Sequence, residues 1–321
     1  MTWRGLPKPQ PLSPAAAAPD GAVAGLCVLA SGSSGNASVL VVRGDKGWVR
    51  GGGSRVILID AGLSPGITRK RLAERGIGLD DIDDVVLTHL DRDHFHGGWR
   101  RVRDFKRATL RLHRRHLNRA ERDGALLGRN EPLAKDESTP TMLGDRVALH
   151  HTLLDHDQLG VAAFRFALNG ATLGFATDLG RVTPKLESLV NRVDVLAIES
   201  NYCPEMQAAS DRPDFLKRRI TGGAGHLSNQ ECAHAVERVQ PREHAVFLHL
   251  SRQCNHPDLV AEMHQGADYD RTISTQDKPT RWIWLTPSPE NAADAAIRTR
   301  TLRMRSGLTI GDTLSLFAGN T

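Results

Sequence analysis

Residues 88–98 have the sequence Thr88-His89-Leu90-Asp91-Arg92-Asp93-His94-Phe95-His96-Gly97-Gly98, which concentrates side chains that can bind metal. Four possible ligands, His89, Asp91, Asp93 and His94, lie within six residues, after an apolar run and before two glycines. Alternate residues of an extended turn point to the same side, and His94 adds a second direction. These ligands exceed the number that one tetrahedral ion needs, so two ions are expected. Taken alone, the stretch also fits a solvated polar loop.

Polar residues also stand where other predicted strands end. They are Asp60, Asp178 and His249, together with His89 itself. An Asn169-Gly170 pair between residues 161–168 and 171–177 predicts a tight β-hairpin just before Asp178. Since functional groups collect at the carboxyl ends of strands in α/β folds, these side chains are expected to share one site.

Helix signals alternate with these strands. Ser64-Pro65 supplies an N-cap and a proline at the first helical position, and Gly76 ends that helix. Ser228 and Glu231 form a capping box, and Pro241 ends the helix that they begin. Strand–helix units mixed with a hairpin predict an α/β protein with mixed sheets.

The composition is that of a globular protein. Of 321 residues, 40% are hydrophobic and 25% are charged, which excludes a collagenous, wholly disordered or membrane-embedded chain. No stretch reaches the roughly 18 apolar residues of a membrane span, and the first residues lack the apolar core of a secretory signal. A cytoplasmic location with no membrane partner is therefore expected. Fourteen histidines against four cysteines without CxxC spacing favour imidazole and carboxylate ligands over a zinc ribbon or disulfides.

Three segments are expected along the chain. Residues 1–24 are rich in Pro and Ala and predict a flexible leader. A globular domain is predicted over residues 25–286, because the last compact apolar run is Trp282-Ile283-Trp284-Leu285. Residues 287–321 are expected to form a C-terminal tail.

The motif at residues 89–94 resembles the HxHxDH signature of the metallo-β-lactamase superfamily, with Asp91 in place of the second His. Further similarities follow in the family's order: residues 57–62 (ILIDAG), His156, Ala176-Thr177-Asp178 and His249. The resemblance covers about residues 25–286. It implies an α/β fold of four layers, an αββα sandwich of two mixed β-sheets.

Within the superfamily, the chain resembles the branch of YycJ-type (WalJ-type) bacterial DNA exonucleases. That resemblance rests on residues 29–36 (LASGSSGN), 199–202 (ESNY), 225–229 (GHLSN), 249–251 (HLS) and 274–279 (STQDKP). It implies a dinuclear metal-dependent phosphodiesterase, a DNA exonuclease that hydrolyses phosphodiester bonds with a metal-bound hydroxide. A nucleic acid, DNA in particular, is the expected substrate and partner.

The resemblance also implies which side chains bind the two metal ions. The first ion is held by His89, Asp91 and His156. The second is held by Asp93, His94 and His249, and Asp178 bridges the two. The carboxylate of Asp91 is a harder ligand than imidazole, which moves the metal preference toward Mn²⁺ or Mg²⁺ without excluding Zn²⁺. The expected cofactor is two divalent ions, zinc or manganese.

Two residues are expected to take part in the chemistry itself. Asp93 additionally orients the hydroxide, and His226 in Gly225-His226-Leu227-Ser228 donates a proton or a hydrogen bond to the leaving oxygen. His226 stands just before a capped helix start, where the helix dipole favours an anion. Asp60 is expected to orient the ligand loop through hydrogen bonds without binding metal.

Basic residues are concentrated directly after the metal motif. Residues 99–122 carry ten Lys or Arg and two Asp or Glu, a net charge of +8 against +5 for the whole chain. Arg100, Arg101, Arg103 and Arg107 are expected to form a phosphate-binding rim. A solvated helix face explains the charges equally well. Aromatic residues make up only 5% of the chain, which argues against a base-stacking platform that reads sequence.

Two other functions stay open on the sequence. A hydrolase of the same fold could cleave a small molecule such as a thioester, a lactone or a cyclic phosphodiester, although the basic segment and the His226 motif argue against it. Alternatively, the chain could be a non-catalytic binding protein with a degraded site, which only Asp91 favours.

Overall fold

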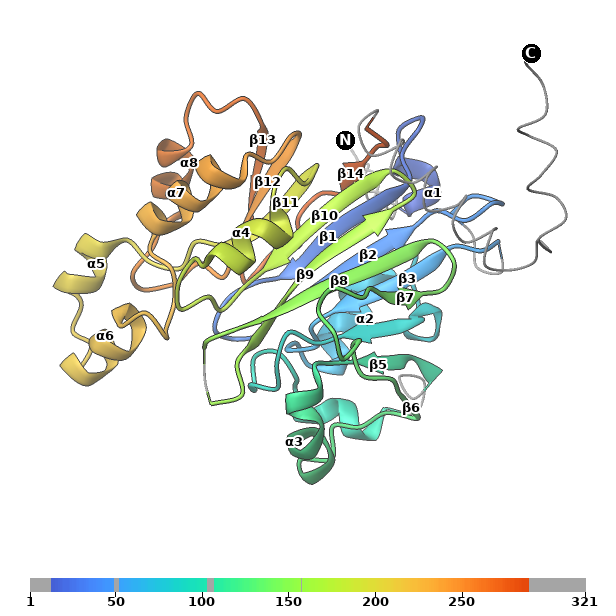
Figure 1. Cartoon of the computed structure of the whole chain (residues 1–321), viewed down its shortest axis with the longest axis horizontal. Coiled ribbons are helices and arrows are strands. Elements are labelled where there is room, and N and C mark those ends of the chain that lie inside the picture. The colour runs from blue at the N-terminus through green and yellow to red at the C-terminus, as the bar shows by residue number, and fades with distance from the viewer. Residues whose placement is uncertain (1–12, 49–51, 103–106, 157, 289–321) are drawn as a thin grey trace, which may run out of the picture.

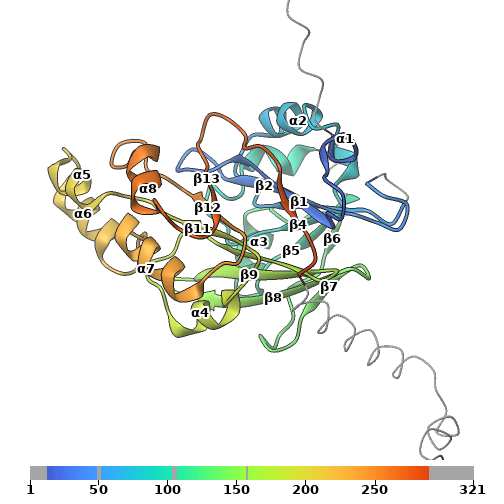
Figure 2. The ribbon, with the colours of Figure 1, turned by 90° about the horizontal axis from the view of Figure 1, so that it is seen from above.

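Two seven-stranded β-sheets lie face to face at the centre of the computed structural model (Figures 1 and 2). The structure describes residues 13–48, 52–102, 107–156 and 158–288. Helices cover the outer face of each sheet: α2 lies above the first sheet and α4 below the second in Figure 2. The order of layers is therefore helix, sheet, sheet, helix, and the predicted αββα sandwich is confirmed.

The first sheet combines antiparallel and parallel pairs. Its strands, in spatial order, are β14 (Ile283–Leu285), β1 (Ala24–Ala30), β2 (Ala37–Val42), β3 (Arg55–Ile59), β4 (Asp84–Val86), β5 (Thr109–Arg111) and β6 (Arg129–Asn130). Pairs from β14 to β3 are antiparallel, and those from β3 to β6 are parallel.

The second sheet is mixed in the same way. Its strands, in spatial order, are β13 (Asp270–Ile273), β12 (His244–Leu248), β11 (Val195–Glu199), β10 (Ala171–Ala176), β9 (Val161–Leu168), β8 (Val147–Leu154) and β7 (Thr141–Leu143). Strands β10 to β13 are parallel, and β7 to β10 are antiparallel. Asn169 and Gly170, with φ of 46° and 91°, join β9 to β10 in the tight hairpin that the sequence predicted.

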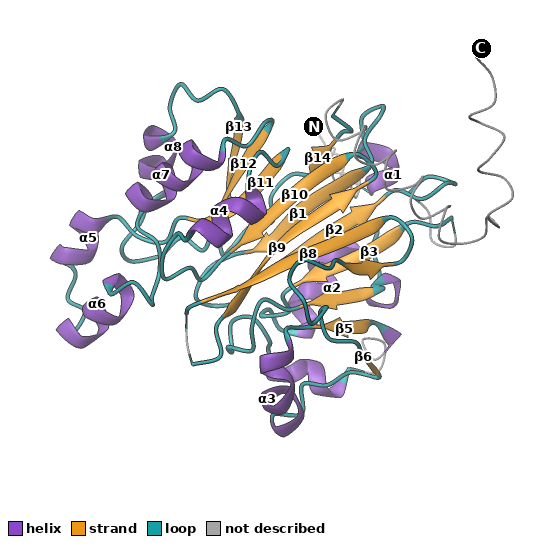
Figure 3. Cartoon of the chain, in the orientation of Figure 1, coloured by secondary structure: helices purple, strands orange, loops and turns teal. Residues whose placement is uncertain are grey.

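Eight α-helices are present in the described part of the chain. They are α1 (Pro14–Ala17), α2 (Pro65–Ala73), α3 (Leu117–Arg122), α4 (Pro184–Val190), α5 (Pro204–Ala209), α6 (Asp214–Thr221), α7 (Asn229–Val239) and α8 (Pro257–Met263). Ser64 caps α2 by accepting from the Ile67 amide, and the Ser228–Glu231 capping box opens α7, as predicted. Figure 3 shows that α5 and α6 stand apart from the sheets and are joined to them by loops.

The central strands of both sheets, such as β1, β2, β10 and β11, are apolar and buried on both faces. In β1, Leu26 and Val28 pack between the two sheets, whereas Cys27 and Leu29 pack under the helices of the first sheet. A third apolar cluster fills the space between the second sheet and the helices α4, α7 and α8. This period of two fixes the register of each strand and hence the position of the residue that follows it.

The ends of the chain lie largely outside the described residues. Of the predicted leader, residues 13–24 are described; they include α1 and lead into β1, and Ala22 is buried. Of the predicted tail, only Pro287 and Ser288 are described. No helix of the described residues is both long and apolar enough to cross a membrane.

Candidate metal centre

Three polar residues of the site follow strands in a left-handed backbone conformation. Asp60 follows β3 with φ of 59°, Asp178 lies two residues beyond β10 with φ of 53°, and His249 follows β12 with φ of 57°. This conformation is unfavourable for residues other than glycine, and it persists where surrounding contacts hold it. The turn that each residue makes at the end of its strand brings its side chain to the site.

The loop at residues 88–98 is fixed to the ends of β2 and β3. The amide and hydroxyl of Thr88 donate to the Asp60 carboxylate at 2.8 and 3.0 Å, and the Asn36 amide donates to the Asp93 carbonyl at 2.7 Å. At Gly62, a Cβ atom would lie only 1.6 Å from the Asp93 carbonyl oxygen. Glycine is required there because the loop passes directly over it.

His89, Asp91 and His156 offer ligand atoms that all lie within 4.8 Å of one another. His89 Nε2 is 3.8 Å from Asp91 Oδ2, and the His89 and His156 rings are 5.3 Å apart. His156 Nδ1 donates to the Gly225 carbonyl at 3.1 Å, which leaves its Nε2 as the unprotonated nitrogen that can bind a metal. Asp91 is additionally paired with Arg119, at 3.0 Å.

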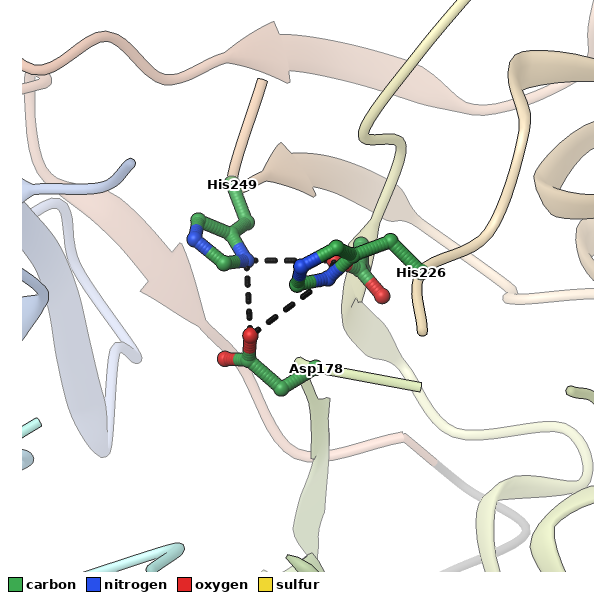
Figure 4. A group of neighbouring side chains, drawn as sticks. Asp178, His226 and His249 are labelled. Atoms are coloured by element: carbon green, nitrogen blue, oxygen red, sulfur yellow. Dashed lines mark hydrogen bonds and ion pairs between the residues drawn. The ribbon is translucent and has the colours of Figure 1, made fainter. Parts of the chain in front are cut away.

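Asp178 lies between two histidines and contacts each with a different oxygen. Asp178 Oδ2 is 2.7 Å from His94 Nε2, and Oδ1 is 3.1 Å from His249 Nδ1. Figure 4 shows Asp178, His226 and His249 gathered around one point. Asp93 Oδ2 is 3.7 Å from the Nε2 atoms of both His94 and His249. Asp178 thus contacts two histidines of the cluster, and it also groups with His89 and His94 as ligand atoms within 4.8 Å of one another; its role as a bridging ligand stays a prediction.

Asp60 lies behind His94 and fits the orienting role that the sequence predicted for it. Its Oδ2 is 2.8 Å from His94 Nδ1, on the side of the ring away from Asp178. The carboxylate accepts from Nδ1, so the ring is oriented with Nε2 toward the cluster.

Glu199 is a member of the site to which the sequence assigned no role. It ends β11 and is fully buried. Its Oε1 lies 2.7 Å from His226 Nδ1 and 3.1 Å from His249 Nδ1, and its Oε2 accepts from the Leu179 amide at 2.7 Å. Its position at the end of a predicted strand could have identified it, because the other polar residues of the site also follow strands.

Burial and ion pairing shift the protonation of the cluster in opposite directions. Burial, together with the charge of His94, lowers the pKa of His89 well below its usual range. Burial also acts to lower the pKa of His249, but the carboxylates of Asp178 and Glu199 outweigh it and raise the value to about 10. For Asp178, burial is outweighed by His249 and His94, which lower the pKa of its carboxyl well below the usual range.

These donors fit a divalent cation. The buried carboxylates need positive charge beside them, which protonated imidazole or a metal ion can supply. In the described chain, His249 Nε2 is buried without a hydrogen-bond partner. Imidazole and carboxylate are ligands that zinc and manganese both accept.

A cleft of about 710 Å³ opens over the cluster. His89, Asp178, His226 and His249 line it, and the His226 ring lies 5.6 Å from that of His156. Arginines from one further segment also line the cleft: Arg212, Arg218 and Arg219. Of the predicted phosphate rim, Arg100, Arg101 and Arg107 are exposed and are not among the lining residues, and Arg103 lies outside the described residues.

Comparison with known proteins agrees with this geometry. Exodeoxyribonuclease WalJ of Streptococcus pneumoniae is 29% identical over 238 residues, which make up 73% of this chain and 84% of that protein. Exodeoxyribonuclease YycJ of Bacillus anthracis is 26% identical over 235 residues, again 73% of this chain and 84% of that protein. The structure is also similar to the crystal structure of YhfI, a metallo-β-lactamase fold protein from Bacillus subtilis. The TM-score is 0.59 at 14% identity, over 80% of this chain and 99% of that one, so the similarity is of the fold.

The family model gives the broadest match to the sequence. The beta-lactamase superfamily domain matches residues 55–250, which run from β3 past the end of β12 and include His89, Asp178 and His249. The match covers β3 to β6 of the first sheet, β7 to β12 of the second and the clustered side chains at their edge. The chain therefore belongs to the beta-lactamase superfamily.

Proposed function

We propose that the protein is a metal-dependent phosphodiesterase that acts on DNA as an exonuclease. The observation that carries the proposal is the pair of His226 and Glu199 in the cleft, beside clustered imidazole and carboxylate ligands. A positioned imidazole beside a metal cluster suits the cleavage of a bond whose leaving oxygen needs a proton. Relatives that cover most of the chain are named exodeoxyribonucleases, which supports DNA as the substrate.

The proposed cofactor is two divalent ions, manganese or zinc. His89, Asp91 and His156 would hold one ion, and Asp93, His94 and His249 the other, with Asp178 between them. When bound, such ions lower the pKa of water and stabilise negative charge that develops on a phosphoryl oxygen.

His226 is proposed to donate a proton to the leaving oxygen. The Glu199 carboxylate accepts from His226 Nδ1 at 2.7 Å, and this fixes the orientation of the ring. The other ring nitrogen is then the proton donor toward substrate in the cleft. Glu199 is itself held by the Leu179 amide, so the pair is positioned before substrate binds.

Asp93 is proposed to orient the attacking water. Its side chain is partly exposed, lines the cleft and lies 3.7 Å from His94 and His249. An ionised carboxylate accepts a hydrogen bond from water. Because this fixes the orientation of the water, one of its lone pairs can be directed at the phosphorus. The arginines of the cleft supply the positive charge that a phosphate substrate needs.

The experiment assays the purified protein with Mn²⁺ or Zn²⁺ against bis-p-nitrophenyl phosphate and end-labelled DNA. We expect cleavage of both, loss of cleavage with a chelator, and weaker DNA cleavage at higher salt. His226→Ala should lower turnover with the metal content unchanged, and His234→Ala, an exposed histidine of α7, serves as its control. Cleavage of a lactone or thioester without cleavage of a phosphodiester would instead identify a small-molecule hydrolase.

A further inference from the structure

The segment that contains α5 and α6 forms one wall of the cleft but contributes little to the core. In α6, Arg218, Arg219 and Ile220 line the cleft, and Ile220 is the one buried residue of that helix. Figures 1 and 2 show α5 and α6 at one extremity of the molecule, away from both sheets. Packing therefore explains few of the side chains on this wall, and the others are available to bind a ligand.

Arg212 precedes α6 and is held rigidly in the cleft. Its Nε donates to Gln253 at 3.1 Å, its Nη1 to Gln207 at 3.0 Å and its Nη2 to Ser251 at 3.2 Å. All three acceptors are neutral, so the positive charge of the guanidinium is not cancelled by these partners. A guanidinium has five N–H groups, which leaves two for a ligand. Its partner Ser251 follows His249 by two residues in the sequence, and all three residues line the same cleft. A fixed guanidinium whose charge its partners do not cancel suits a phosphate there.

Arg218 and Arg219 add charge along the same wall. Both are exposed and line the cleft, and they lie in the last turn of α6. Neither makes an ion pair with any residue of the described chain. Long guanidinium side chains that face a cleft without an acidic partner are available for the phosphates of a substrate.

Phe215 stands beside these arginines with 68% of its side chain exposed, the highest value among the large hydrophobic residues that the structure describes. It precedes Arg218 and Arg219 by three and four residues on α6, so the three side chains are neighbours on the helix surface. A single exposed aromatic residue is unremarkable by itself. Phe215 is not among the residues that line the cleft, but it neighbours two arginines that are. The pair of an exposed ring and positive charge matches the combination of stacking surface and charge that binds single-stranded nucleic acid where the strand leaves the cleft.

We infer that Arg212, Phe215, Arg218 and Arg219 bind the single strand of DNA that continues from the reacting phosphodiester out of the cleft. The arginines contact its phosphates, and Phe215 stacks against an unpaired base. Stacking requires a base free of its partner, so this wall favours a single strand over a duplex. The contact tolerates any base sequence, because every base has an aromatic face. The inference rests on the proposed function and identifies where that function holds its substrate.

The test compares the kinetics of three variants of the full chain with Mn²⁺ present. Phe215→Ala should raise KM for single-stranded DNA about 5-fold or more, because stacking contributes about 5-fold to 150-fold in affinity per base. Phe215→Trp should restore it. Arg218→Ala with Arg219→Ala should raise KM and lower the salt dependence of binding, by about 0.7 in log–log slope per lost phosphate contact.

Hydrolysis of bis-p-nitrophenyl phosphate should be unchanged in both Phe215 variants, because Phe215 is not among the residues that line the cleft; this also shows that both are folded. The double arginine variant is checked for folding by its thermal melt. Lys185→Ala, which removes an exposed charge elsewhere, is the matched control. If the wild-type protein cleaves DNA and the variants keep its KM for single strands, the inference is wrong and the proposed function stands. If the wild-type protein cleaves no DNA, the proposed function itself fails.

Discussion

Asp178 illustrates how one side chain organises the candidate metal centre. Its two oxygens face different histidines, His94 and His249, which come from a loop of the first sheet and from a strand end of the second. Because its backbone is left-handed and its carboxylate buried, Asp178 has little freedom to move. Asp178 thus joins the loop of the first sheet to the strand end of the second at the candidate metal centre.

Glu199 offers the sharpest single-residue prediction. Glu199→Gln keeps the shape of the side chain but removes the charge that faces His226 at 2.7 Å. We expect kcat to fall about 10-fold to 100-fold, the range typical of partners that orient a functional histidine, with KM little changed. Steady-state kinetics on a phosphodiester, with metal content measured in parallel, checks this. A variant that loses its metal would show that Glu199 belongs to the ligand set instead.

Several of these residues could be identified from the sequence, and others could not, for a physical reason. The ligand candidates His89, Asp91, Asp93 and His94 are close in sequence, so their proximity is visible without a fold. Glu199, by contrast, lies 27 residues from His226 and 50 from His249. Only the parallel pairing of β11 with β12 brings those strand ends together.

At the scale of elements, buried strands and capped helices were predictable, and the exposed helices were not. Strands β9 and β10 are apolar on both faces and flank a turn sequence with one preferred geometry, so their limits follow from local chemistry. Helices α5 and α6 each bury a single residue, and neither begins with a side-chain cap, so no capping signal marks where they start. The arginines that line the cleft belong to α6 and the residues before it, and not to the predicted rim. Charge density in a sequence does not reveal which element lines a cleft.

The loop over Gly62 provides a test of how the first sheet positions the site. Gly62→Ala places a Cβ 1.6 Å from the Asp93 carbonyl, so residues 88–98 must shift. We expect a loss of about 1–3 kcal/mol in the free energy of unfolding, together with weaker metal binding. Gly66→Ala in α2 is the control, since a Cβ there meets nothing within 4 Å and should stabilise the helix. Equal unfolding curves for the two variants would contradict the role given to Gly62.

Strand β8 contains a buried histidine that predicts how stability responds to acid. Neither ring nitrogen of His151 has a hydrogen-bond partner in the described chain, and burial, with the charge of His113, lowers its pKa from 6.5 to about 4. In the unfolded chain this histidine binds a proton below about pH 6.5, whereas in the folded protein it does so only below about pH 4. The free energy of unfolding therefore falls as the pH is lowered from about 6.5 to about 4. His151→Leu should remove roughly 2 kcal/mol of this loss at pH 4.5. Urea unfolding of both proteins at pH 7 and pH 4.5 measures the difference; parallel changes in both would exclude His151 as the cause.

At the scale of the whole molecule, the fold followed from the order of a few motifs. Two mixed sheets and their covering helices are confirmed, and so is membership of the superfamily. The meeting of the two sheet edges was expected only from the polar residues at strand ends and from the order of the family motifs, because no local signal joins a strand end of one sheet to that of the other. The assignment of each ligand to one of two ions stays a prediction.

Metal binding should stabilise the whole domain, because the ligands come from both sheets. His94 follows β4 of the first sheet and His249 follows β12 of the second, so a metal that is bound to both exists only in the folded state. At a free metal concentration 100 times the dissociation constant, the gain is about 2.7 kcal/mol, and the melting temperature should rise by roughly 5–10 °C for a domain of this size.

Thermal melts of chelator-treated protein, before and after Mn²⁺ or Zn²⁺ is added, measure this gain. Asp178→Asn should abolish the shift, because the amide replaces the carboxylate that contacts both His94 and His249. Asp258→Asn, at an exposed position in the first turn of α8, should keep it. If the melting temperature of Asp178→Asn still rises when metal is added, the ions bind elsewhere on the chain. Ligands from both sheets would then not explain how metal stabilises the domain.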